Sequence, residues 1–489
     1  MNKNALDGFR AKVAVIGSGP GGAISAATLQ ESGVSTLLIE EGPSERPGDR
    51  EPFSADEMAA KYRNGGQTVA FGPARVQYVE GRCVGGGSEI NSGLYHRTPG
   101  EILEQWRRDY GVIGSTIDDL RPFFERCERA VNVCKSPGPP APMAAKLRAG
   151  ATAMGWSSIE VPRWVTYGTG RYDSLGTPIG EKNSMSATFI PRFLAAGGRL
   201  ESNLRAIRIQ RSGGRFHIEC ERTPQGGRPS REIVIAEKVV VSGGAVQTPL
   251  LLRRSGLTHR IGDTLHLHPT VKIVAEFEEE VTCPGAGVPS EQVKEFSPEL
   301  SFGCSISTLG HLAVNLLMHR DALRTLKGRW RNMATYYVMA RGDGIGSVRS
   351  LPGARDAFVR YQISETDARN LRKGIAHLAR LLFAAGAIRL YPVLAGSEVL
   401  EDEGSVSRMY GQFEAPSANV MTIHLFSSCP MGEVETVTAT DSFGRVRGTA
   451  GLVIADASIL PTSLGVNPQG SIMALTSRNI EFLISEGYF

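Results

Sequence analysis

A glycine-rich turn between a buried strand and a helix constrains this chain more than any other feature. Residues 11–17 (AKVAVIG) form a short apolar run, and residues 21–32 (GGAISAATLQES) have the alanine content and spacing of a helix. The turn at residues 17–22 (GSGPGG) fits the GxGxxG pattern of dinucleotide-binding folds. A second apolar strand follows at residues 34–40, so the chain is predicted to begin as a doubly wound sheet.

Each position of the turn has a physical task. Gly17 permits the tight turn, Gly19 lets the backbone approach a pyrophosphate, and Gly22 permits close packing of helix on strand. The free N–H groups and the dipole of the helix N-terminus favour the phosphates. Glu40 ends the second strand and is expected to accept hydrogen bonds from ribose hydroxyls, with Glu41 as the alternative.

This fingerprint does not by itself distinguish NAD from FAD. It lies near the start of a chain of 489 residues and is followed by further glycine-rich loops, which favours a large, permanently bound dinucleotide and therefore FAD. Residues 43–81 are polar and irregular. Residues 271–362 alternate between apolar and polar and predict an antiparallel sheet with one exposed face, and residues 365–386 predict a long helix.

Composition and charge exclude several functions. A net charge of +4 without a block of Lys or Arg argues against a nucleic-acid partner. No run of 18 apolar residues occurs, so no membrane span is expected. Seven scattered cysteines without a CxxC pair favour a reducing compartment, and we expect a cytoplasmic protein. The pair His266 and His268 lacks a third ligand at metal spacing, so no metal site is expected.

Four further motifs resemble those of the glucose–methanol–choline (GMC) oxidoreductase family. They are the loop 81–93 (GRCVGGGSEINSG), the run 242–257 that begins SGGAVQTPLL, the segment 262–269 that ends in His-Pro, and the C-terminal run 424–468. The last contains HLFSSCPMG, DASILP and GVNP, where the family has HxxGTCxMG and DxSxxP. The loop and the His/Asn pair look nearest to the cholesterol-oxidase and choline-oxidase side of the family.

The resemblance implies an α/β fold with a Rossmann-like FAD-binding domain and an interleaved α+β substrate domain built on an antiparallel sheet. The FAD-binding domain is expected at residues 1–100, 190–270 and 415–489, and the substrate-binding domain at 101–189 and 271–414. Besides Gly17, Gly19, Gly22 and Glu40, the cofactor-binding residues implied are Gly86, Ser88, Asn91, Leu204, Gly244, Asp456, Ala457, Pro468 and Gln469.

Some relatives attach FAD covalently through a histidine just before the position of Asn91. Ile90 stands there in this chain, so non-covalent FAD is expected.

By the same resemblance, His424 is the acid/base group of an alcohol oxidation, and Asn467 holds the alcohol oxygen while hydride passes to flavin N5. His268 is expected to have a structural or cofactor-adjacent role, and whether His96 or His268 lines the active site stays open. The substrate is expected to be a small alcohol, first of all a polar one such as a sugar, amino sugar or aminocyclitol. The final electron acceptor is O₂ or another carrier.

Three other functions remain open at this stage. An NAD-dependent dehydrogenase could use the same fingerprint, and a few family members keep FAD but act as lyases on cyanohydrins. A degenerate binding protein is disfavoured because His424 and Asn467 are intact. The oligomeric state is not indicated by the sequence.

Overall fold

The glycine-rich turn lies in a seven-stranded sheet. In the computed structural model, β1 (Arg10–Ile16) pairs in parallel with β2 (Thr36–Ile39) on one side and β12 (Ser230–Val241) on the other. Helix α1 (Pro20–Glu31) connects β1 to β2, which confirms the expected unit of strand, turn, helix and strand. The structure describes residues 9–45, 48–168, 170–223 and 228–489.

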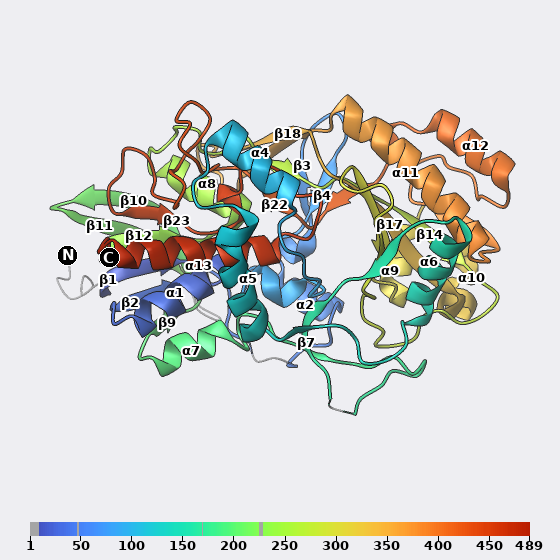
Figure 1. Cartoon of the computed structure of the whole chain (residues 1–489), viewed down its shortest axis with the longest axis horizontal. Helices are drawn as coiled ribbons and strands as arrows, with labels where there is room; N and C mark the ends of the chain where they lie inside the picture. The colour runs from blue at the N-terminus through green and yellow to red at the C-terminus, as the bar shows by residue number, and fades with distance from the viewer. Residues whose placement is uncertain (1–8, 46–47, 169, 224–227) are drawn as a thin grey trace.

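The remaining strands of this sheet come from the middle and the end of the chain. β9 (Arg199–Glu201) pairs in parallel with β2, and β23 (Leu452–Ile454) pairs in parallel with β12. β10 (Leu204–Ser212) and β11 (Arg215–Arg222) add an antiparallel edge. Figure 1 shows the blue N-terminal and red C-terminal segments side by side in this half of the molecule.

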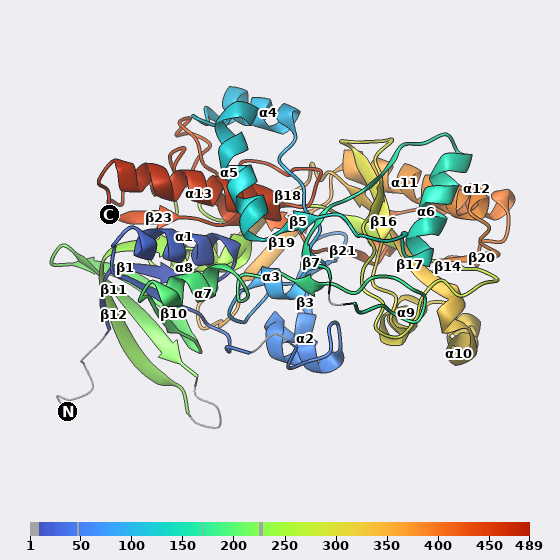
Figure 2. The same cartoon turned by 60° about the horizontal axis from the view of Figure 1, so that its bottom comes forward.

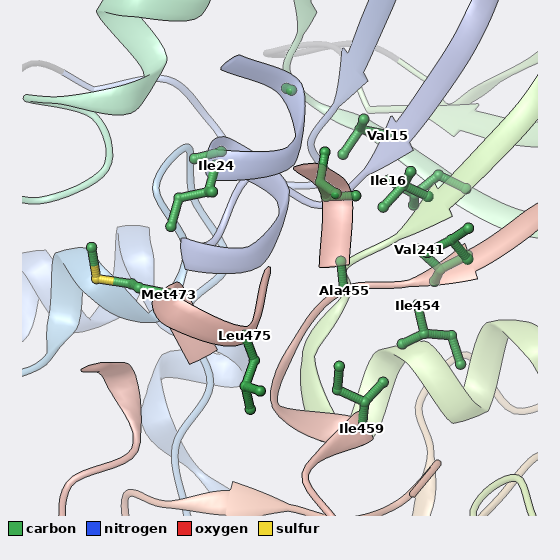
Figure 3. Close-up of a cluster of buried hydrophobic side chains, with 14 of the residues drawn as sticks. Val15, Ile16, Ile24, Val241, Ile454, Ala455, Ile459, Met473 and Leu475 are labelled. Atoms are coloured by element: carbon green, nitrogen blue, oxygen red, sulfur yellow. The ribbon is translucent and has the colours of Figure 1, made fainter. Parts of the chain in front are cut away.

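Helices α1 and α13 (Gln469–Ser485) pack together against this sheet. Figure 3 shows part of the apolar cluster that the two helices share with the sheet, with Ile24 of α1 and Met473 of α13 on one side and Val241 and Ile454 of the sheet on the other. All four side chains are fully buried. The first residues of the two helices, Pro20 and Gln469, line the same cavity, so the packing of this cluster also positions two helix N-termini.

The second half of the molecule contains a nine-stranded, largely antiparallel sheet around β14 (Thr270–Glu276) and β17 (Met333–Ala340). Figure 2 shows helices α6 (Pro142–Ala153) and α11 (Glu365–Ala384) beside it. The other strands are β3 (Thr68–Ala70), β4 (Val76–Tyr78), β6 (Ser158–Glu160), β15 (Glu291–Val293), β16 (Leu300–Cys304), β20 (Arg389–Pro392) and β21 (Val420–Thr422).

The two faces of this sheet have different surroundings. Val271 and Ile273 of β14 belong to the core cluster that includes helix α11, whereas the alternating residues Thr270 and Lys272 line an internal cavity. The sequence predicted that one face of this sheet is exposed to solvent. That prediction is wrong for the central strands, because the other half of the molecule covers this face.

Smaller elements complete the chain. The helices are α2 (Ala55–Lys61), α3 (Gly87–Ile90), α4 (Gly100–Tyr110), α5 (Ile117–Ala130), α7 (Phe189–Ala195), α8 (Gly244–Arg254), α9 (Leu309–Asn315), α10 (Arg320–Arg329) and α12 (Glu403–Gln412). Short strands are β5 (Val133–Cys134), β7 (Arg163–Thr166), β8 (Glu181–Lys182), β13 (His266–Leu267), β18 (Ile345–Arg349), β19 (Phe358–Gln362) and β22 (Leu425–Phe426).

Two groups of elements pack against the half of the molecule opposite to the one in which the sequence placed them. Strands β3, β4 and β21 pair in the nine-stranded sheet, although residues 68–78 and 420–422 were assigned to the FAD-binding domain. Helices α4 and α5 bury Trp106 and Phe124 in the core of the FAD-binding half. Residues 311–315, within the segment predicted as antiparallel sheet, instead belong to helix α9, because the Thr308 hydroxyl caps a helix there.

We predict that Ile24→Ala lowers the free energy of unfolding by about 2–5 kcal/mol, because it leaves a cavity in a fully buried cluster. Ile113→Ala is the matched control, since the Ile113 side chain is 56% exposed and should change stability by less than about 0.5 kcal/mol. Chemical denaturation of both variants measures this, and equal midpoints would contradict the assigned core.

Candidate active site

A single cavity of about 990 Å³ runs between the two halves of the molecule. One end lies at the carboxyl ends of β1 and β2, where Gly17, Gly19 and Glu40 line it. The other end lies against the nine-stranded sheet and contains His424 and Asn467. Ligands of open α/β sheets bind outside the carboxyl ends of the strands, so this cavity is the candidate site.

Two glycine-rich loops meet at the first end. Gly86 has a φ of +54°, and a Cβ atom built on it would lie 2.8 Å from Cα of Gly19. Helix α1 begins beside this contact, and no side chain caps its N-terminus. The first N–H groups of α1 therefore face the cavity and are available to a phosphate.

The space in front of these loops fits a flat ligand. A Cβ atom built on Gly87 would meet no protein atom within 4 Å, and one built on Gly19 would meet only Gly86, at 4.0 Å. Neither residue has a φ that requires glycine. Glycines facing open space are consistent with a bound group that occupies it, as an FAD would.

The acidic residues at the end of β2 have different partners. Glu40 is buried and accepts hydrogen bonds from the amide and hydroxyl of Ser18, at 3.0 and 2.7 Å, and from the Gly42 amide. Burial is the main cause that raises its pKa. Glu41 forms an ion pair with Arg63 at 2.8 Å, and despite burial this charge holds the pKa of Glu41 at about 2. Glu40 is thus the carboxylate without a cationic partner.

At the middle of the cavity, Asp456 holds the start of helix α8. It accepts hydrogen bonds from the Gly244 amide at 2.9 Å and from the Thr248 hydroxyl at 2.5 Å. Leu204, Gly244, Asp456 and Ala457 all line the cavity, as the resemblance implied.

The second glycine-rich loop is tied to the last helix. Nδ2 of Asn91 donates to Oε1 of Gln469 at 2.7 Å, and both residues line the cavity together with Gly86 and Pro468. Ile90 also lines the cavity and offers no atom for covalent attachment of a flavin.

Two of the expected cofactor residues do not line the cavity. Ser88 is fully buried, and its hydroxyl donates to the Gly85 carbonyl and accepts from the Met185 amide. Gly22 lies behind the turn, where a Cβ atom would meet the Gly17 carbonyl oxygen at 1.8 Å. Both residues therefore shape the loops from behind.

The expected catalytic pair is brought together from two distant segments. The side-chain amide of Asn467 lies 3.2 Å from Nε2 of His424, and both side chains are buried. The amide of Gln292, on β15, lies 3.3 Å from the Asn467 amide and 2.9 Å from the Tyr337 hydroxyl. The nine-stranded sheet thus supports the pair from the substrate side.

His268 lies behind His424 and fixes the position of its hydrogen. The Gly465 amide donates to Nε2 of His268 at 3.0 Å, so a neutral His268 carries its hydrogen on Nδ1. This Nδ1 lies 3.0 Å from Nδ1 of His424, which must therefore be the acceptor. A neutral His424 then carries its hydrogen on Nε2. In the structure Nδ2 of Asn467, which can only donate, faces this nitrogen, so this order requires the Asn467 amide in the opposite orientation, with its oxygen toward Nε2.

Burial and a nearby cation keep these histidines neutral. Burial and then the Lys294 charge lower the pKa of His424 to about 3, and burial, Lys294 and His424 lower the pKa of His96 to about 3. Burial and the His424 charge hold the pKa of His268 well below its ordinary value. All three imidazoles are neutral at pH 7.

Sequence reasoning missed Lys294 and Gln292 and gave little weight to His96. The ring nitrogens of His96 and Nζ of Lys294 are buried and make no hydrogen bond of good geometry within the described part of the chain. His96 has the Asn467 side chain within reach. No motif marks these residues; only the contact between the two halves places them beside His424.

The described residues contain no group of three or more His, Cys, Asp or Glu side chains that could hold a metal ion. None of the helices built from these residues is long and apolar enough to cross a membrane.

Comparison with known proteins identifies the family of the chain and its cofactor. Models of "GMC oxidoreductase" match residues 58–270 and 346–476, and one of "FAD binding domain" matches residues 10–51. These matches establish FAD as the cofactor.

Two relatives with an assigned activity also match. A long-chain-alcohol oxidase of Arabidopsis thaliana is 26% identical over 96% of this chain and 67% of that protein. The 6'''-hydroxyparomomycin C oxidase of Streptomyces lividus is 26% identical over 97% and 91%.

The fold matches that of pyridoxine 4-oxidase from Mesorbium loti, with a TM-score of 0.72 at 17% identity, over 97% of this chain and 99% of that one. The expected α/β fold class is thereby confirmed.

An uncharacterised GMC-type oxidoreductase of Sinorhizobium fredii is 38% identical over 98% of this chain and 95% of that protein. The chain belongs to the GMC oxidoreductase family of FAD-dependent enzymes.

Proposed function

We propose that this enzyme oxidises an alcohol whose oxygen is bound between His424 and Asn467. The observation that carries the proposal is the 3.2 Å contact of these two buried side chains at the far end of the cavity from the dinucleotide fingerprint. When bound, FAD would supply the acceptor for the hydride of the alcohol carbon, and O₂ or another carrier would reoxidise it. The absence of a histidine at Ile90 supports non-covalent FAD.

The ordering of hydrogens assigns His424 the acid role of the pair. Because its Nε2 carries the hydrogen, His424 donates to the alcohol oxygen and stabilises the negative charge that develops there. The positive charge of Lys294 adds to this effect. The sequence led us to expect that His424 takes the proton. That role needs a free lone pair on Nε2, which the orientation of the Asn467 amide favours and the Gly465–His268 chain disfavours.

His96 is the group we propose as the proton acceptor. Its imidazole is neutral and has one acceptor nitrogen, whose lone pair no described residue occupies with good geometry. It lies beside Asn467 but is not among the residues that line the cavity, so the proposal requires its ring to turn toward the oxygen held by Asn467 and His424. General-base catalysis of this kind contributes about 10²–10⁴ to the rate.

The relatives point to two different classes of substrate. The name 6'''-hydroxyparomomycin C oxidase agrees with the expected polar alcohol, whereas the long-chain-alcohol oxidases favour an apolar chain. We propose a polar alcohol, because Thr270, Lys272, His311 and Asn419 line the substrate end. Seven unpaired cysteines in the described structure suit a reducing compartment, and we propose the cytoplasm.

We predict that an alcohol reduces the flavin of this enzyme in the absence of oxygen. The purified enzyme should show the absorption of oxidised flavin, which acid precipitation should release, and a panel with a sugar alcohol, an amino sugar and a long-chain alcohol should contain one that bleaches it. His424→Gln keeps a donor near the position of Nε2 and should reduce flavin at least about tenfold faster than His424→Ala. His96→Gln should be slower than wild type by about 10²–10⁴.

His259→Gln, on the exposed surface, is the matched control. If His424→Gln is as slow as His424→Ala while His96→Gln keeps the full rate, His424 is the base and the hydrogen order is wrong. A yellow enzyme that no alcohol bleaches would instead favour the alternative of a lyase.

We predict that the folded protein loses stability in acid. His424, His96 and His311 have folded pKa values of about 3, 3 and 4, below the ordinary value of 6.5. The unfolded chain therefore binds more protons than the folded one between these limits. Stability should be complete above about pH 6.5 and fall below it, by up to about 1.4 kcal/mol per pH unit for each histidine.

Thermal unfolding between pH 7.5 and 4.5 measures this slope. His311→Gln should flatten it, whereas His259→Gln should leave it unchanged. Identical slopes for wild type and His311→Gln would show that His311 is not buried in its neutral form.

A further inference from the structure

The substrate end of the cavity contains a positive charge without a counterion. Lys272 lies on β14 on the face that lines the cavity, next to Thr270. Its cross-strand neighbour on β17 is Tyr337. On the other side, the Val393 amide donates a hydrogen bond to the Lys272 carbonyl. No hydrogen bond or ion pair joins Nζ of Lys272 to any residue in the described part of the chain.

No carboxylate lies at this end of the cavity. Among the described residues from 270 to 424 that line it, none is Asp or Glu. The polar residues there are neutral donors or acceptors, namely Thr270, Ser305, Thr308, His311, Asn315, Tyr337, Asn419 and Thr422. Burial is the only cause that lowers the pKa of Lys272, to about 8, so it is still largely charged at pH 7.

Lys272 is half-buried, and an ammonium group that loses water without gaining a partner is costly. The apolar residues of the opposite face cannot explain it, because Val271 and Ile273 point into the core and Lys272 points the other way. Such a charged side chain in a cavity lowers the stability of the fold. A ligand that carries the opposite charge would compensate for this when it binds.

A short path connects Lys272 to the proposed catalytic pair. Tyr337 is opposite Lys272 in the β14–β17 register, its hydroxyl lies 2.9 Å from the Gln292 amide, and Gln292 reaches Asn467. Lys272 is therefore separated from Asn467 by two side chains. A ligand that spans both needs several atoms between its two ends.

We propose that the substrate is a hydroxy acid, with a carboxylate bound by Lys272 and with its alcohol, several atoms away, between His424 and Asn467. One lysine matches the single charge of a carboxylate. The alcohol half of this proposal rests on the proposed function. An amino sugar or aminocyclitol would instead place its ammonium group near Lys272 with no carboxylate to receive it.

The charge selectivity can be measured without turnover. Hexanoate and hexylamine are titrated against the FAD-loaded enzyme, and binding is followed by the change in flavin absorption and by thermal shift. Hexanoate should bind and hexylamine should not. Lys272→Met should weaken hexanoate binding at least about tenfold, and Lys272→Arg should retain it. Lys373→Met, on the exposed side of α11, is the matched control.

Turnover is then compared for 4-hydroxybutanoate, 6-hydroxyhexanoate and 8-hydroxyoctanoate, each beside the diol and the amino alcohol of equal length. One hydroxy acid should bleach the flavin at least about tenfold faster than its diol in wild type, but not in Lys272→Met. Equal binding of hexanoate by wild type and Lys272→Met would overturn the proposal, even if alcohols are oxidised. Selective hexanoate binding with no bleaching by any alcohol would support the Lys272 site and overturn the proposed oxidation.

Discussion

The parallel pairing of β1 with β2 and β12 is the constraint on which the rest of the structure depends. It places the carboxyl ends of three strands at one edge and turns the N-terminus of α1 toward that edge. The β12–β23 pair then brings in the C-terminal segment, so Asp456 lies beside Gly244, 212 residues earlier in the chain. A cofactor cavity assembled from three distant segments follows directly from this one register.

The second half of the molecule determines the electrostatics of the cavity. Its sheet covers the histidines and removes them from water, which keeps His424, His268 and His96 neutral. In such surroundings a backbone N–H can decide the chemistry, because the Gly465 amide orients one imidazole and that imidazole orients the next. The uncompensated charges of Lys294 and Lys272 act strongly for the same reason.

Much of the fold could be predicted because the relevant signals are local. The spacing of apolar residues identified β1, α1, β2 and α11, and the motif residues Gly19, Gly86, Asn91 and Gln469 do line one cavity. Gly22 packs closely against the turn, in the role that its motif position predicted. Ser88 lies behind its loop and not in the cavity, because a motif gives the residues and not the direction of each side chain. Residues 311–315 form a helix within the segment predicted as antiparallel sheet, because a short amphipathic helix and a half-buried strand share a similar composition.

The sequence by itself determined the dinucleotide fingerprint and the family, and it predicted the pair His424 and Asn467, because these depend on residue types at fixed spacing. Only the tertiary structure decided what faces each nitrogen of His424, that His96 and Lys294 lie near it, and that Lys272 faces the cavity. The alternation of residues 271–362 predicted a sheet with one polar face, but not what covers that face. The residues that cover this face come from segments far apart in the chain, and a local sequence pattern does not predict such a contact.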